Sequence, residues 1–597
     1  MQRARAMVGR AVAATLDRWP LLLICSLGVT ANLVWLAQHR RGLPFDIDEA
    51  GYLQRALADG HALSHGGITG FFSHLHDPDP QAPLLPAVAG AAHALFGVGP
   101  VGMMGVQNVF YVVLVCSAWY LGARVADRRF AIVMAVVAAA LPGVLYETRT
   151  FQFGLVAAAT YALALVALLA ARDLTSWKRC ALWGISLGVA ALSRTMVLGL
   201  IPGLLLAAGA RFVTAGPTLR RAANLALAIV LGFLVAWTWY SASWHNVVHY
   251  LRDYGYGAKA ASYGPGHAPL SPGWWSFRFD DIAEAICYFC LVVAVALAVG
   301  ATLGAIVADR WISGSRAGTE VQRAPVSSRV RRALAGDTAS VTIVAGYGYL
   351  ALSSTRNLGS MFELPIVAPL LVVILAAAWG RPVARPVMVV AVIAASAFTF
   401  VQSTGALPLH HRTVRLGTKA VPVYDDRGNL GDNGRRTLLL PASATNSQVE
   451  DTLRRYQAAT ADVAQKILER TRSAGVAPVI FFGVQDPWFN PNTVGLDLYL
   501  ATEDVPLVGL FEPVPATPQD AVRLLEDPAR GEPNVVITGP VYPDPDAPDA
   551  LAYEILPDPA PAVAGLRADG FVAFATVKVP DGRTMTLWFK KRGPALS

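Results

Sequence analysis

Three acidic side chains, Asp46, Asp48 and Glu49, follow the first apolar segment of the chain in the stretch "RGLPFDIDEAGYL". A carboxylate held at a membrane surface has the chemistry of a general base toward an acceptor hydroxyl. A polar loop between two membrane helices is the alternative interpretation of the same residues. The other charged residues of the chain help to distinguish the two.

Isolated charges recur between and inside the apolar segments. "YETRTFQF" contains Tyr146, Glu147 and Arg149, Arg194 stands alone within 180–211, and "SSTRNLGSMFELP" contains Arg356. Ionisable groups at membrane depth are costly and tend to be functional. Acids and arginines that face one compartment predict a site for a substrate with a phosphate and hydroxyls. Snorkelling at a helix end is the alternative for Arg149 and Arg356, whereas Arg194 needs a partner among its apolar neighbours.

The stretch "SHLHDPDPQAPLLP" is a candidate site for a divalent cation such as Mg²⁺ or Mn²⁺. Imidazole and carboxylate groups are ordinary ligands of such ions, and the stretch supplies His74, His76, Asp77 and Asp79. A merely polar loop is the alternative. Gln81 completes the polar residues of this turn and is a further candidate for contact with the substrate.

The composition indicates an integral membrane protein. Of 597 residues, 54% are hydrophobic and only 15% are charged, whereas about a quarter of the residues of a soluble protein are charged. Although the net charge is +8, arginine and lysine gather in short clusters between apolar runs, as in cytoplasmic loops. We therefore expect the chain to lie in a lipid bilayer and not to bind nucleic acid.

The apolar runs predict about eleven transmembrane helices. Four arginines precede the first run, so we expect a cytoplasmic N-terminus, and the later basic clusters fall on the same side. This orientation makes the protein a multi-pass protein of the cytoplasmic (inner) membrane with an extracytoplasmic C-terminus. The expected spans are 20–38, 101–123, 129–146, 151–171, 180–194, 196–211, 222–243, 283–307, 338–354, 361–379 and 386–402.

We expect two domains. Residues 1–402 form the transmembrane domain, with a large first outer loop at 39–100. Residues 403–597 form an extracytoplasmic α/β domain, because short β-branched runs such as "PNVVITGP" alternate with the amphipathic helix that begins at "QVEDTLRRYQ".

These motifs resemble those of the GT-C membrane glycosyltransferases. The resemblance rests on the acidic pair after the first span, the "APLLP" turn followed by "AAHALFGVGPVG", the charged second outer turn, and "GVAALSRTMVL". The pattern is most similar to the bacterial branch related to protein O-mannosyltransferases and to the aminoarabinose transferases that modify lipid A. The resemblance covers residues 20–400 and, more loosely, the C-terminal domain.

The resemblance implies roles for individual residues. Asp48 stands where the family has its catalytic aspartate, with Glu49 beside it and Asp46 as a bystander. Arg194 matches the basic residue that contacts the lipid phosphate, helped by Arg149 or Arg356. Many members have Lys or His before Pro-Pro in the proline-rich turn; here Gln81 or His76 would take that place. Glu147 and Tyr146 are further candidates for the substrate site.

The resemblance therefore predicts an enzyme that moves a sugar from a polyprenyl-phosphate donor to a hydroxyl of a cell-envelope glycan, lipid or protein. The donor already carries a leaving group, so a single displacement with inversion suffices, with Asp48 as general base. A divalent cation is able to take over part of the arginine role. The alternatives are a transporter or flippase of a polyprenyl-linked or anionic lipid, and a non-catalytic scaffold. Transporters usually show repeat symmetry and midplane charges, and neither is evident here.

Overall fold

The structure is a computed structural model, and it forms two compact units. Unit 1 comprises residues 1–37, 68–88 and 102–428, and unit 2 comprises 38–67, 89–101 and 429–597. Most of the predicted first outer loop thus belongs to the same unit as the C-terminal residues. The residues described are 2–257, 268, 270–275, 296–297, 299–300, 302–304, 336–354, 363–403, 412–416, 419–424, 438, 440–441, 444–484, 487–502, 507–510, 515, 517–527, 532–540 and 559–592.

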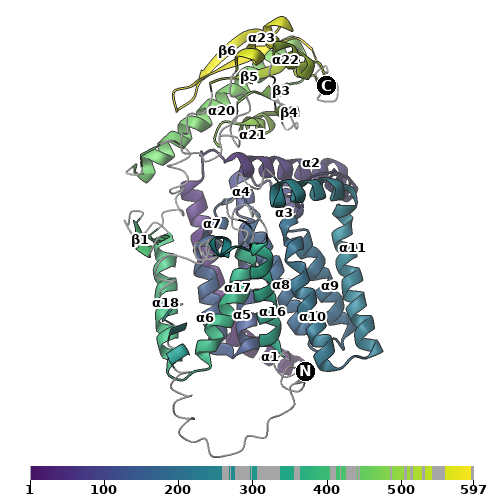
Figure 1. Ribbon diagram of the computed structural model, residues 1–597, viewed down its shortest axis with the longest axis vertical. Coiled ribbons are helices and arrows are strands. Elements are labelled where there is room, and N and C mark those ends of the chain that lie inside the picture. The colour runs from purple at the N-terminus through teal and green to yellow at the C-terminus, as the bar shows by residue number, and fades with distance from the viewer. Residues whose placement is uncertain are drawn as a thin grey trace, which may run out of the picture. The chain divides into compact units, whose positions relative to one another are not determined.

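Unit 1 is a helical bundle whose long helices run side by side (Figure 1). Helix α8 is apolar on every face and buried along its length, and it packs against α5, α9 and α17. The helices of the bundle are α1 (Gln2–His39), α4 (Pro100–Met104), α5 (Gln107–Val125), α6 (Arg128–Ala140), α7 (Pro142–Glu147), α8 (Gly154–Ala171), α9 (Trp177–Ala191), η1 (Thr195–Gly199), α10 (Ile201–Ala215), α11 (Leu219–Tyr250), η2 (Leu251–Tyr256), α16 (Asp337–Ser353), α17 (Leu364–Trp379) and α18 (Ala384–Ser403). A hairpin of β1 (Arg412–Leu416) and β2 (Lys419–Tyr424) follows α18.

The chain is a multi-pass membrane protein. Six helical segments of the described residues are long and apolar enough to cross a bilayer: Arg18–His39, Pro100–Val125, Gly154–Ala171, Thr195–Ala215, Leu219–Asp253 and Ala384–Ser403. Helices also occupy the other predicted spans except 283–307, which lies largely outside the described residues. The count of eleven spans and their orientation stay predictions.

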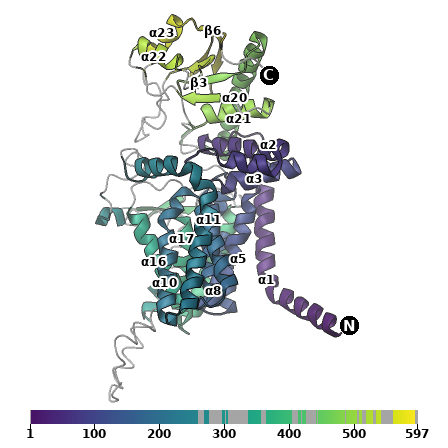
Figure 2. The ribbon, with the colours of Figure 1, turned by 90° about the vertical axis from the view of Figure 1, so that its right-hand side faces the viewer.

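The predicted break within 180–211 is confirmed. Helix α9 ends at Ala191 and α10 begins at Ile201, with the short helix η1 between them. Helix α1 is bent along its length (Figure 2). Pro20 lies inside α1, where a proline removes a backbone hydrogen bond and favours such a bend.

Helices α2 (Ile47–Leu75) and α3 (Leu84–Phe96) each have residues in both units. Helix α2 is interrupted at Gly67, whose φ of 60° and ψ of −157° are not helical. Helix α3 crosses the first half of α2 closely within unit 2, because a Cβ added at Gly60 would lie 2.8 Å from the carbonyl oxygen of Gly90. The glycines at this crossing allow the two backbones to approach.

Unit 2 contains a five-stranded mixed sheet in the order β4-β3-β5-β7-β6. The strands are β3 (Val479–Phe482), β4 (Leu507–Leu510), β5 (Val535–Thr538), β6 (Val572–Lys578) and β7 (Thr584–Phe589). The first three are parallel, and β7 is antiparallel to both β5 and β6. The predicted α/β character of the C-terminal residues is confirmed.

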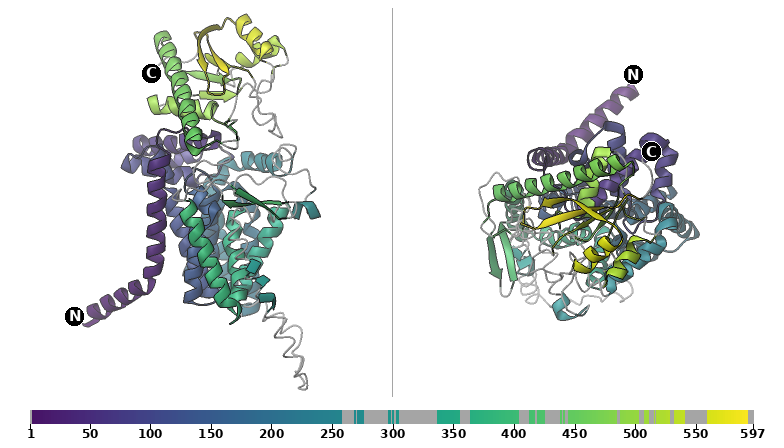
Figure 3. Two further views of the ribbon diagram at one scale, coloured as in Figure 1. Left: turned by 90° about the vertical axis from the view of Figure 1, so that its left-hand side faces the viewer. Right: turned by 90° about the horizontal axis from the view of Figure 1, so that it is seen from above.

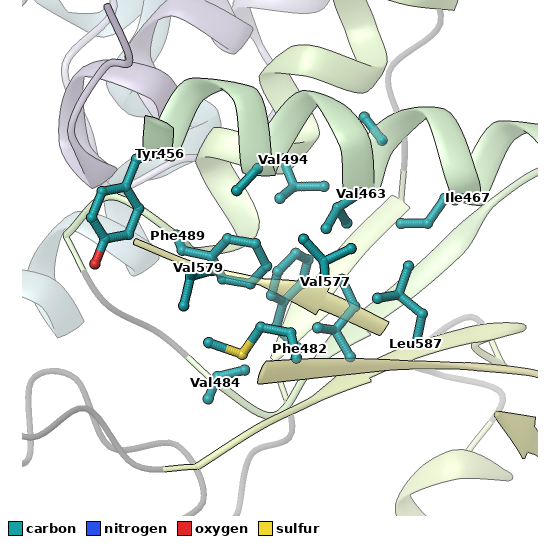
Figure 4. Packing of buried hydrophobic residues seen from close by; sticks show 14 of the residues in the cluster. Tyr456, Val463, Ile467, Phe482, Val484, Phe489, Val494, Val577, Val579 and Leu587 are labelled. Carbon is teal, nitrogen blue, oxygen red and sulfur yellow. The ribbon is translucent and has the colours of Figure 1, made fainter. Parts of the chain in front are cut away.

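Helices cover both faces of this sheet (Figure 3). Helix α20 (Asn446–Ala474) places Tyr456, Val463 and Ile467 in one core with Phe482 and Leu587 (Figure 4). Helices α22 (Pro518–Leu525) and α23 (Ala560–Ala568) form a second core with the neighbouring strand residues, among them Phe481 and Trp588. Successive residues of β3 thus enter opposite cores, as the two-residue period of a strand requires.

Candidate functional site

The acidic stretch after α1 begins helix α2 through a reciprocal cap. The backbone N–H of Glu49 donates to Asp46 Oδ1 at 2.8 Å, and the backbone N–H of Asp46 donates to Glu49 Oε2 at 3.2 Å. This is the arrangement of a capping box, here with Asp at the N-cap. It places all three acids in or beside the first turn of the helix, where the helix dipole favours negative charge.

Glu49 forms a buried ion pair with Arg40 inside unit 2. Arg40 Nη2 lies 2.7 Å from Glu49 Oε2, and only 1% and 2% of the two side chains are exposed. The Arg40 guanidinium also stacks on the Phe45 ring, with its carbon 5.2 Å from the ring centre. A buried carboxylate in such a pair is held by its partner. We therefore infer that Glu49 holds the N-terminus of α2 in position.

Asp48 is the exposed acid of the three. Asp46 is half-buried, and burial, followed by the negative charges of Glu49 and Asp48, raises the pKa of its carboxyl well above the usual range. Asp46 therefore has a structural role as the cap of the helix, and its carboxyl interacts electrostatically with those of Glu49 and Asp48. The arrangement leaves Asp48 on the solvent-accessible side of a helix end that the other two acids fix.

Helix α21 (Pro491–Thr502) holds the first half of α2 within unit 2. Asn492 Nδ2 donates to the carbonyl oxygen of Ile47 at 2.7 Å, and Gln54 Nε2 donates to the carbonyl oxygen of Asn492. Two turns further, the hydroxyl of Tyr499 donates to the carbonyl oxygen of Leu57 at 3.1 Å. The contact to Ile47 lies next to Asp48 in the chain, so α21 helps to fix the backbone that carries this acid.

Within unit 1 the structure brings together the proline-rich turn and the "LSRT" break. Thr195 Oγ1 donates to the carbonyl oxygen of Pro80 at 2.7 Å, and the N–H of Leu84 donates to the carbonyl oxygen of Leu192 at 3.1 Å. Arg194 is half-buried and extended, with φ −161° and ψ 132°, between α9 and η1. The sequence neighbours of Arg194 and Gln81 are therefore hydrogen-bonded to each other.

The proline-rich turn is itself ordered by local hydrogen bonds. The N–H of Gln81 donates to Asp79 Oδ1 at 2.6 Å, and the N–H of Asp79 donates to Ser243 Oγ on α11 at 3.3 Å. Asp79 and Gln81 are half-buried. Ser243 is a residue of this region that sequence reasoning missed, since a serine inside a long apolar helix carries no motif.

The charged residues of "YETRT" are buried in the bundle. Arg149 is 2% exposed, donates from Nη1 to the carbonyl oxygen of Ser403, and has its guanidinium carbon 4.6 Å from the centre of the Trp35 ring. Glu147 is fully buried, and its Oε2 accepts from the N–H of Leu155 at 3.1 Å at the start of α8. These contacts join α7 to α1, α8 and α18.

Gly154 and Gln107 lie beside the turn between α7 and α8. Gly154 leaves room for the Glu147 side chain, because a Cβ at Gly154 would lie 2.7 Å from the carboxyl. Gln107, which sequence reasoning missed, donates from Nε2 to the carbonyl oxygen of Gln152 at 2.6 Å. Tyr146 is half-buried. Arg356 lies outside the described residues.

The four candidate metal ligands are not gathered into a cation site. His76 Nδ1 lies 2.8 Å from the carbonyl oxygen of Phe72, and His74 Nε2 lies 3.8 Å from Asp77 Oδ2. Across the described ranges, no three or more His, Cys, Asp or Glu side chains are arranged to hold a metal ion. Asp79 instead accepts from the backbone of its own turn. These four described side chains therefore do not form a metal site by themselves, and a divalent cation stays a prediction.

No family model matches the sequence, and no curated protein does either. The chain is similar in structure to ArnT from Cupriavidus metallidurans in the apo state, with a TM-score of 0.53 and 14% sequence identity over 96% of this chain and 98% of ArnT. ArnT bound to undecaprenyl phosphate gives a TM-score of 0.51 with the same identity and coverage. The archaeal oligosaccharyltransferase AglB from Archaeoglobus fulgidus aligns with a TM-score of 0.44 and 12% identity over 88% of this chain and 70% of AglB.

The match to ArnT extends over almost the full length of both chains, including the C-terminal residues. It confirms, at the level of the fold, the resemblance that the motifs indicated. The chain therefore has the fold of ArnT, a GT-C membrane glycosyltransferase.

Proposed function

We propose that this protein is a GT-C membrane glycosyltransferase that moves a sugar from a polyprenyl-phosphate donor to a hydroxyl of a cell-envelope acceptor. The observation that carries the proposal is the state of the three acids at the start of α2: Asp46 caps the helix, Glu49 pairs with Arg40, and Asp48 is exposed. The shared fold with ArnT, one structure of which contains undecaprenyl phosphate, supports the class of donor.

In the proposed reaction Asp48 removes the proton of the acceptor hydroxyl. The acceptor oxygen attacks the anomeric carbon, the bond between that carbon and the phosphate oxygen breaks, and the electron pair leaves with the polyprenyl phosphate. General-base catalysis of this kind contributes roughly 10²–10⁴-fold to the rate. A single displacement inverts the configuration at the anomeric carbon.

Arg194 is proposed to stabilise the phosphate as its charge develops. A guanidinium binds phosphate oxygens through charge-assisted, often bidentate hydrogen bonds. Gln81 belongs to the turn that is hydrogen-bonded next to Arg194 and is proposed to contact the donor. His76 has an exposed ring and stays a further candidate.

Arg149 and Glu147 are proposed to position the turn between α7 and α8. Contact between Arg149 and the phosphate, which the sequence suggested, would require the guanidinium to leave Trp35 and Ser403. The sequence-based expectation that a divalent cation shares the phosphate with Arg194 stays a prediction, and no step is assigned to the cation.

The proposed location of the reaction is the outer face of the cytoplasmic membrane. It follows from the expected cytoplasmic N-terminus and from the basic clusters between the apolar runs. The acceptor would then be a glycan, lipid or protein of the cell envelope.

The proposal is tested by incubating the purified full-length protein in detergent with a panel of undecaprenyl-phosphate-linked pentoses and hexoses and a lipid or glycan acceptor extract. We expect transfer of one sugar with release of undecaprenyl phosphate and an inverted anomeric carbon, measured by NMR of the product. If the same protein, reconstituted into vesicles, moved the lipid across the membrane without transfer, that result would instead support a flippase. Transfer with retention would contradict the single displacement.

A further inference from the structure

A second polar region of unit 1 lies at the opposite end of α9 from Arg194. A cavity of about 410 Å³ opens where α5, α8 and α10 end and α16 begins. Three arginines, Arg124, Arg172 and Arg211, line it. The acids among its described lining residues are Asp173 and Asp337, so these described residues together carry a net positive charge.

Two of the arginines are fixed by a shared carboxylate. Arg124 Nη2 lies 2.6 Å from Asp337 Oδ2, and Arg211 Nη2 pairs with Asp337 Oδ1. Arg211 also donates from Nε to Ser340 Oγ at 2.7 Å, and only 7% of its side chain is exposed. Asp337 is therefore shared by two guanidinium groups, and the wall of the cavity is preorganised.

The loop between α8 and α9 is held in a strained conformation at the rim of the cavity. Arg172 and Leu174 have φ values of 50° and 58°, which L-residues with side chains seldom adopt. The carbonyl oxygens of residues 172, 173 and 174 accept hydrogen bonds from Arg211 at 3.1 Å, Arg221 at 3.0 Å and Asn224 at 2.8 Å. Strain that the surroundings enforce in this way is concentrated at functional sites.

Arg172 in this loop has guanidinium N–H groups that are able to bind a ligand. The Arg172 side chain is exposed, and within the described ranges its guanidinium makes no hydrogen bond or ion pair. The Arg124 side chain pairs with Asp337 but is 26% exposed, so part of it is also accessible from the cavity. Guanidinium groups with free N–H donors are suited to the oxygens of a phosphate ester.

Exposed apolar side chains occur on the helix ends that flank this loop. Trp177 begins α9 and is 58% exposed, Val213 near the end of α10 is 57% exposed, and Leu219 at the start of α11 is 88% exposed. Tryptophan at the end of a membrane span is typical of the level of the lipid headgroups. Basic pockets between transmembrane helices at this level bind anionic headgroups.

We propose that this cavity binds the phosphate of an anionic phospholipid headgroup, with Arg172 and Arg124 as its donors. The apolar residues beside it favour a lipid over free phosphate, since they provide a surface for acyl chains. From the expected orientation of the chain, the lipid belongs to the cytoplasmic leaflet. The site is separate from the proposed catalytic region and does not depend on the proposed function.

The test uses the full-length protein, delipidated in detergent, and native mass spectrometry with phosphatidylglycerol as the probe. We expect one saturable phosphatidylglycerol to bind, and Arg172→Ala to weaken it about tenfold, the effect of roughly one charge-assisted contact. Arg172 is exposed and alanine is no more strained than arginine at its φ of 50°, so we expect the variant to fold, which its unfolding temperature checks. Arg129→Ala removes an exposed arginine from the same end of the bundle without lining the cavity, and binding should be unchanged.

Three competitors decide the class of the ligand. We expect phosphatidylcholine and inorganic phosphate at matched concentration to leave the bound phosphatidylglycerol in place. Displacement by inorganic phosphate would identify a free-phosphate site, and displacement by undecaprenyl phosphate would identify a second donor-lipid site; either result would overturn the proposal. Equal affinity of the wild type and Arg172→Ala for phosphatidylglycerol would also overturn it.

Discussion

Arg40 and Glu49 form an ion pair with 2.7 Å between Nη2 and Oε2, and both side chains are almost completely buried. The same Glu49 carboxylate closes the cap of α2 by accepting from the N–H of Asp46. One carboxylate thus anchors the helix end on which Asp48 is exposed. The consequences of this relationship for stability and for catalysis are separable by mutation.

Removing one partner of the pair should destabilise unit 2 strongly. Arg40→Met leaves the Glu49 charge buried without its partner, and such changes cost about 3–5 kcal/mol. The double variant Arg40→Met/Glu49→Met should recover much of this loss, because no buried charge remains. Thermal unfolding in detergent measures both, with Arg41→Met as the exposed control; a single variant as stable as the control would contradict the role of the pair.

The stability of the protein should depend on pH through Asp46. Its raised pKa means that the folded chain binds a proton more tightly than the unfolded chain, whose carboxyl titrates near pH 4. Stability from this group is therefore present at low pH and falls as the pH rises from about 4 through the raised value.

Asp46→Asn isolates this effect, because asparagine is an equally good N-cap but does not titrate. We expect its unfolding temperature to vary less with pH than that of the wild type and to match or exceed it at neutral pH. Asp46→Ala, which loses the cap, should instead cost about 1 kcal/mol. Parallel pH profiles for wild type and Asp46→Asn would show that Asp46 does not titrate as described.

Loss of the hydrogen bond from Asn492 on α21 to Ile47 on α2 should lower the turnover number. Asn492→Ala removes the hydrogen bond to Ile47, next to Asp48, so we expect kcat to fall roughly tenfold or more while KM for the donor changes little. Tyr499→Phe removes the matching bond to Leu57, which lies ten residues beyond Ile47 on α2, and should have a smaller effect. If both variants raised KM and left kcat unchanged, α21 would serve donor binding rather than the placement of the acid.

Arg194 and Arg149 should behave differently although both are arginines in the bundle. Arg194→Gln should lower kcat by roughly 10²–10³-fold, as when a transition-state donor is lost, with little change in the unfolding temperature. Arg149→Gln should lower the unfolding temperature, because Arg149 is buried against Trp35 and Ser403. Measuring both quantities for both variants distinguishes the roles, and a reversed pattern would contradict them.

Apolar runs were sufficient to predict the helices of the bundle, because a bilayer demands long, uninterrupted apolar segments. The break at Arg194 was predictable for the same reason, since a charge in an apolar run is tolerated where the helix ends. The D-x-x-E pattern of residues 46–49 signals a capping box, although these acids were interpreted above only as a catalytic group or a polar loop. The burial of Arg149 and the contact of Asn492 with Ile47 depend on residues distant in the chain, which local patterns do not identify.

The central claim is that Asp48 is the base, and the most direct test measures sugar transfer by Asp48→Asn. Asp77→Asn is the matched control, because the Asp77 side chain is 73% exposed and is not assigned to the reaction. We predict that Asp48→Asn still binds undecaprenyl phosphate and unfolds at the wild-type temperature, but loses transfer by roughly 10²–10⁴-fold, whereas Asp77→Asn stays active. A folded Asp48→Asn protein with full transfer activity would contradict the assignment.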